Sequence, residues 1–151
     1  MKTQNMFLII IVILFLLPSI GFTQNMEVHN LIGKSRNEVI KKYGAPVHKD
    51  ESNPDMICMF YKNKTSSMIF VSDQSGVYQA EATKSYDTQA EARSIVDSFI
   101  SNSLTNGFAI DTVSTSDFRL QKKGVKVDLQ LSENKLAKTF DVKVKANKTE
   151  S

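Results

Sequence analysis

Few side chains in this sequence are of the types that carry out chemistry. The 151 residues include two histidines, His29 and His48, and a single cysteine, Cys58. Neither histidine has a cysteine, histidine or carboxylate at the spacing of a metal site, and no nucleophile motif accompanies the serines. We therefore predict no catalytic, cofactor-binding or metal-binding residues, and a protein that is not an enzyme. An enzyme would require the fold to join a histidine to carboxylates in one pocket.

The cysteine lies in the apolar stretch from Met56 to Phe60. One cysteine cannot form a disulfide within the chain, so the fold must depend on its hydrophobic core. An apolar setting predicts a buried and inert thiol for Cys58. The alternative is a reactive thiol or one that pairs with a second molecule.

The segments 56–61 and 67–72 are apolar at nearly every position. Read as strands, each has two apolar faces, and both faces need cover. We expect a helix at 88–106 to cover one face, and a helix at 35–43 or the segment before it to cover the other. The alternative is a face that stays partly open and binds a protein or a lipid. The candidate interaction residues are Ile57, Met59, Tyr61, Ile69 and Val71.

Two helices and seven strands must position these residues. Ser35 with Glu38, and Thr88 with Glu91, have the spacing of capping boxes that begin helices. Strands are predicted at 56–62, 67–72, 77–85, 108–113 and 117–122 from apolar segments bounded by turn residues. Strict alternation of apolar and polar residues predicts strands at 125–131 and, from Phe140 on, within 136–146, with a turn at 132–135. The predicted fold class is α+β, as two helix-then-antiparallel-meander units with the helices packed on an antiparallel sheet. One domain spans 35–147, with a candidate pseudo-repeat of 35–86 and 88–147, a lead-in segment at 24–34 and a polar tail at 148–151.

The first 23 residues have the pattern of a secretory signal peptide. Lys2 precedes an unbroken apolar run from Met6 to Leu17, and small residues follow near Thr23. The run is shorter than the roughly 20 residues that span a bilayer, so we expect cleavage before Gln24 and no stable membrane span afterwards. We therefore predict an exported protein, periplasmic or secreted. Because no cysteine follows the run, we expect that it is not a lipoprotein.

Residues 31–46, LIGKSRNEVIKKYGAP, resemble the glycine-capped helix motif of the BamE/SmpA envelope family, which shares the β-lactamase-inhibitor-like fold. The resemblance implies an antiparallel meander after the helix and a non-catalytic module that binds other proteins. The chain lacks the lipid-carrying cysteine of that family, and no functional residue is transferred.

These observations predict an exported binding module that recognises another envelope protein. The alternative function is a carrier or sensor of a lipid or another apolar small molecule, held between the helix at 88–106 and the sheet. Without Lys2 the formal charge falls from +3 to +2, which is too mild for nucleic-acid binding. No cofactor is expected.

Overall fold

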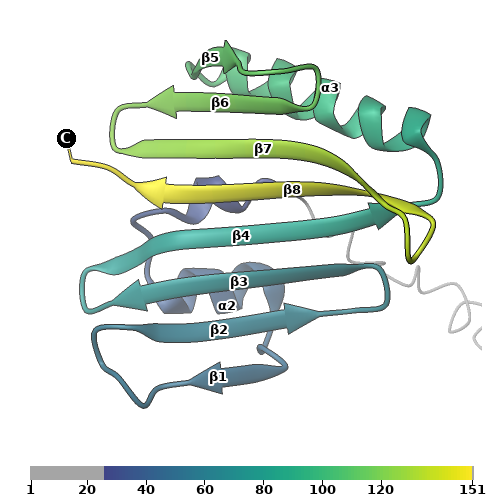
Figure 1. Cartoon of the computed structure of the whole chain (residues 1–151). Helices are drawn as coiled ribbons and strands as arrows, with labels where there is room; N and C mark the ends of the chain where they lie inside the picture. The colour runs from purple at the N-terminus through teal and green to yellow at the C-terminus, as the bar shows by residue number, and fades with distance from the viewer. Residues whose placement is uncertain (1–25, 151) are drawn as a thin grey trace, which may run out of the picture.

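The computed structural model describes residues 26–150, and antiparallel strands dominate them (Figure 1). The signal-peptide prediction lies outside the described residues. Eight strands form one sheet in the order β1-β2-β3-β4-β8-β7-β6-β5. The elements are η1 (Val28–Leu31), α2 (Arg36–Tyr43), β1 (His48–Asp50), β2 (Ile57–Lys62), β3 (Ser66–Asp73), β4 (Gly76–Tyr86), α3 (Gln89–Thr105), β5 (Ala109–Thr112), β6 (Asp117–Lys122), β7 (Val125–Asn134) and β8 (Thr139–Lys148).

Both predicted helices are present, and each begins at the predicted cap. The Ser35 hydroxyl accepts a hydrogen bond from the Glu38 amide, and the Glu38 carboxylate accepts one from the Ser35 amide at 2.8 Å. At the start of α3, the Thr88 hydroxyl accepts from the Glu91 amide. Because such bonds satisfy amides that have no partner within the helix, they fix where each helix starts.

All the described helices lie against one face of the sheet (Figure 1). Strand side chains that point to this face are buried, as the alternation along β2 and β7 shows. Aromatic rings join α2 to the sheet, since the Tyr43 ring lies 5.5 Å from that of Phe70. The fully buried core residues include Val28, Val39, Met59, Phe70, Val77, Val96, Leu120, Val127, Val142 and Val144.

The predicted fold class is wrong in its arrangement. The structure has one continuous eight-stranded sheet, not two helix-then-meander units. Strands β4 and β8 pair over eight positions, from Gln79 with Asn147 to Tyr86 with Phe140. Small and branched side chains such as Ala82 and Val144 meet across this pair, and both are buried beneath the helices. Alternation in a sequence assigns residues to faces of a strand, but it does not identify the neighbouring strand.

The expected cover on both faces is also absent among the described residues. Both α2 and α3 pack on the same face, and so does η1 (Figure 1). The opposite face of the sheet, which we call the open face, has no described element over it. Within residues 26–150, no helix has the length and apolar character needed to cross a membrane.

Candidate interaction surface

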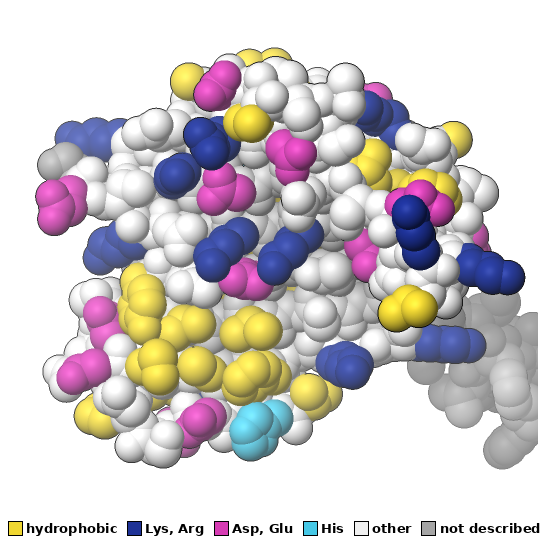
Figure 2. Space-filling view, viewed as in Figure 1, with side chains coloured by type: hydrophobic (Ala, Val, Ile, Leu, Met, Phe, Trp, Pro, Cys, Tyr) yellow, Lys and Arg dark blue, Asp and Glu magenta, His cyan; other side chains and the backbone are white. Residues whose placement is uncertain are grey.

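The open face is divided into an apolar half and a polar half. Figure 2 shows apolar side chains gathered over the β1–β4 side of the sheet, and charged side chains over the remainder. The charged side chains next to the apolar half come from β4 and β8. The carboxylate of Glu81 on β4 lies 3.4 Å from the ammonium of Lys143 and 3.2 Å from that of Lys145, both on β8. This row of charges marks one border of the apolar half.

Strand register assembles the apolar half. Cys58 pairs with Val71, and Phe60 pairs with Ile69, so these four side chains point to the same face. Cys58, Phe60 and Ile69 are half-buried, whereas Val71 is buried, with 9% of its surface exposed. We call Cys58, Phe60, Ile69, Val71 and Tyr78 the open-face patch.

A β-bulge adds Tyr78 to the patch. Val71 pairs with Gln79 and the next residue, Ser72, pairs with Val77, which leaves Tyr78 without a partner in the ladder. Its phenol lies near Cys58, and its pKa is raised by loss of solvent and by neighbouring negative groups, including Asp73. The bulge therefore places an extra aromatic ring on the open face.

Polar and partly apolar side chains surround the patch. The His48 ring lies 5.4 Å from the Phe60 ring at an interplanar angle of 35°. Met56 precedes β2 and is 51% exposed. A tyrosine, a phenylalanine and a methionine near a half-exposed aliphatic surface are typical of protein interfaces.

The five residues predicted as an interaction patch lie on two different faces. Ile57, Met59 and Tyr61 point into the core, where they are 7%, 0% and 5% exposed. Ile69 and Val71 lie on the open face, as members of the open-face patch. The prediction combined the two faces because it fixed the alternation within each strand without the register between strands. Phe60 and Tyr78 were missed: the alternation that groups Phe60 with Cys58 was visible in the sequence, whereas the bulge was not.

Cys58 is half-buried rather than fully buried. Its pKa is raised by loss of solvent and then by the nearby Asp50 carboxylate, so the thiol form is favoured over the reactive thiolate. The thiol therefore reacts more slowly than an ordinary exposed thiol, and it lies within the open-face patch.

The two histidines are not brought together. His29 is buried between the rings of Phe99 and Phe108, at 5.0 and 5.4 Å, on the helix-covered side, whereas His48 is exposed on β1. Burial lowers the pKa of His29 to about 4. Among residues 26–150, no three histidine, cysteine or acidic side chains are grouped as a metal site requires.

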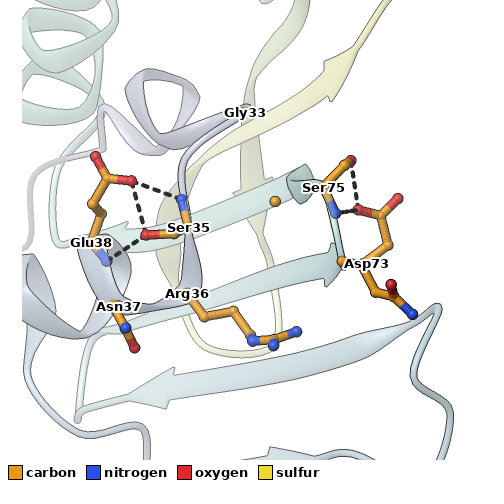
Figure 3. Close-up of a pocket in the computed structure, with 9 residues that line it drawn as sticks. Gly33, Ser35, Arg36, Asn37, Glu38, Asp73 and Ser75 are labelled. Atoms are coloured by element: carbon orange, nitrogen blue, oxygen red, sulfur yellow. Dashed lines mark hydrogen bonds between the residues drawn. The ribbon is translucent and has the colours of Figure 1, made fainter.

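A polar pocket of about 350 Å³ lies between the start of α2 and the β3–β4 turn (Figure 3). Its side chains mainly bond to one another: Glu38 holds Ser35, and Asp73 accepts from the hydroxyl and the amide of Ser75, both at 2.7 Å. These bonds hold the pKa of Glu38 and of Asp73 below their ordinary values. The Glu38 carboxylate accepts from both the amide and the hydroxyl of Ser35, whereas the Nη1 atom of Arg36 in this pocket is buried without a hydrogen-bond partner among the described residues.

No family model and no curated protein sequence matches the chain. The solved structures that resemble it, two of which follow, do so at low sequence identity. One is a cysteine-rich secretory protein from Staphylococcus aureus, with 12% identity, a TM-score of 0.44, and coverage of 78% of this chain and 45% of that one. The other is an extracellular protein containing an SCP domain from Bacillus anthracis, with 13% identity, a TM-score of 0.45, and coverage of 80% and 45%. The chain spans less than half the length of each.

The resemblance to the BamE/SmpA family is wrong. No family model matches the chain, and its helices pack on one continuous eight-stranded sheet instead of the expected helix followed by a meander.

Proposed function

We propose that this chain is an exported, non-catalytic module that binds another protein of the cell envelope through its open face. The observation that supports this most is the division of that face. Cys58, Phe60, Ile69 and Val71 form two adjacent cross-strand pairs of apolar side chains with no described element over them. Contiguous apolar surface of this kind is uncommon on a monomer and marks interaction sites.

The chemistry of the described residues supports a binding role over catalysis. The imidazoles of His29 and His48 lie on opposite sides of the sheet and cannot act on one substrate. In the pocket between α2 and the β3–β4 turn, the carboxylates of Glu38 and Asp73 already accept hydrogen bonds from Ser35 and Ser75. Side chains fill the space between α3 and the sheet, where Ala92 and Val96 are fully buried, so no observation favours a carrier of an apolar ligand.

Export is part of the proposal and depends on the sequence of the first 23 residues. A positive charge at Lys2, the apolar run from Met6 to Leu17 and a small-residue exit support cleavage before Gln24. The absence of a cysteine after that run supports a periplasmic or secreted product without lipid. Mass measurement of the protein recovered from its host would test the cleavage site.

Substitutions on the open face test the binding role. Phe60→Asp and Ile69→Asp each place a charge in the apolar half without removing a core side chain. Gln121→Asp places the same charge on β6, where Gln121 is exposed among polar residues. The tagged variants are compared for partner recovery from envelope extract, after circular dichroism has confirmed that each is folded. We expect Gln121→Asp to recover partner as the unsubstituted protein does and both patch variants to lose it. Equal recovery by all three would refute the assignment.

A further inference from the structure

We propose that the protein bound by the open-face patch is a second copy of this chain, packed face to face about a two-fold axis. This inference rests on the proposed function, since it names the partner of the same surface. It draws on the distribution of charge around the patch, which is opposite at the two ends of the strands.

One end of the patch is acidic. Asp50 pairs with Cys58 at the edge of the sheet, and Asp55 precedes β2. Asp73 ends β3 at the same end, where it lies close enough to Tyr78 to raise the pKa of that phenol. Figure 2 shows acidic side chains along this left border of the apolar area.

The other end is basic. Lys62 ends β2 on the same face as Phe60, and Lys64 follows in the turn to β3. Both are exposed, and no ion pair of either is found among residues 26–150. Figure 2 shows basic side chains to the right of the apolar area. The patch therefore has an acidic end and a basic end, with apolar side chains between them.

A surface with this pattern is complementary to itself. In a two-fold dimer, the same patch contributes from both copies. A two-fold axis that lies in the plane of the contact and crosses the strands at a right angle reverses the strand direction of the second copy. Asp50 and Asp55 of each copy then face Lys62 and Lys64 of the other, while the apolar side chains of the two copies meet between them. Opposite charges at both ends would fix the register of the contact.

The size of the patch predicts a weak dimer. The patch lies on three strands about 4.8 Å apart, and six residues of about 3.4 Å each give it a plane of roughly 300 Å². Stable complexes bury about 800 Å² on each partner, so the patch supplies less than half of that area, and the charged ends must supply the remainder. We expect a dissociation constant in the micromolar range, as for transient complexes.

Sedimentation equilibrium of the exported protein, purified as its host processes it, measures the self-association. We expect a reversible monomer–dimer equilibrium that Ile69→Asp abolishes. Two double variants reverse one end each: Asp50→Lys with Asp55→Lys, and Lys62→Glu with Lys64→Glu. Each alone should weaken the dimer about tenfold, because every charged pair becomes repulsive. An equimolar mixture of the two should form a heterodimer nearly as tight as the original.

A control variant and a thiol probe sharpen the test. Lys123→Glu with Lys126→Glu changes the net charge as the Lys62 and Lys64 reversal does, but both residues lie near the β6–β7 turn, outside the patch. It should leave the dimer unchanged. Cys58 is the only cysteine and belongs to the patch, so its labelling by a maleimide should slow as the protein concentration rises.

Four results would overturn the inference: a monomer at every concentration, a dimer that Ile69→Asp leaves intact, reversals that act no differently from the control, or a mixture that fails to pair. If the protein is monomeric and Ile69→Asp still loses a partner from envelope extract, the second copy is refuted while the proposed function stands. If the protein is monomeric and capture is unaffected, both are refuted.

Discussion

The buried imidazole of His29 should make the stability of this protein fall as the pH drops below neutrality. The side chain is 5% exposed, and its Nδ1 atom is buried without a hydrogen-bond partner among the described residues. Loss of solvent is the main cause that lowers its pKa from 6.5 to about 4; the Lys42 charge acts in the same direction, and the Glu27 carboxylate opposes both.

The sign and size follow from proton linkage. Between pH 6.5 and 4 the unfolded chain binds a proton at His29 that the folded protein does not, so unfolding becomes easier as the pH falls. One pKa unit corresponds to about 1.4 kcal/mol. The free energy of unfolding should therefore fall by about 2 kcal/mol from pH 7 to pH 5 and by about 3 kcal/mol at pH 4. The carboxylates of Glu38, Asp50, Asp73 and Glu81, whose pKa values are lowered, lose their contributions only below the ordinary carboxylate range.

Urea unfolding at pH 7, 6 and 5 measures this effect. His29→Leu removes the titrating group and keeps an apolar side chain between the two phenylalanine rings, so its stability should change little over this range. His48→Gln removes the exposed histidine and should retain the decline of the unsubstituted protein. Parallel curves for the unsubstituted protein and His29→Leu between pH 7 and 5 would refute the reasoning.

Five further substitutions probe the packing, a tight turn and a helix cap. Tyr43→Phe should leave the free energy of unfolding unchanged or slightly raised, because the buried hydroxyl has no described hydrogen-bond partner. Tyr61→Phe should lower the free energy of unfolding by about 1 kcal/mol, because the Tyr61 hydroxyl donates to a main-chain carbonyl at 3.1 Å. Equal effects of the two substitutions in urea unfolding would contradict this. Gly76→Ala should lower the free energy of unfolding by about 1–3 kcal/mol, because φ is +123° and a Cβ atom would lie 2.8 Å from a main-chain oxygen. Thermal unfolding measures this effect, and an unchanged melting temperature would count against that contact. Ser35→Ala should cost about 1 kcal/mol by loss of the capping box with Glu38, and a matched Glu38→Gln variant should cost less, since the amide oxygen still accepts.

Local signals in the sequence were sufficient to predict most elements. The boundaries of α2 and α3 follow from Ser35, Gly44 and Thr88, and the alternation from Val125 to Leu131 identifies β7. These signals depend on neighbouring residues only, which is why they can be read without the fold. The alternation within β7 and β8 also identified which of their residues are buried, because it too depends only on neighbouring residues.

Features that depend on distant partners were not predicted. β1 has three exposed polar residues, and its strand conformation comes from pairing with β2. β7 continues through Ser132, where the sequence suggested a turn, because Ser132 and Glu133 pair with β8. The predicted interaction residues divide for the same reason: Met59 and Ile69 both belong to apolar strands, but the register places them on opposite faces.

The position of β8 constrains the order in which this protein can fold. It is the last strand along the chain, at Thr139–Lys148, yet it lies in the middle of the sheet between β4 and β7. β4 pairs with residues about sixty positions later, so this contact has a high sequence separation and a slow search. Until β8 emerges from the ribosome or the translocation channel, the unpaired edges of β4 and β7 stay available to other strands. Chaperones that act on the nascent chain would therefore be needed longest at these two edges.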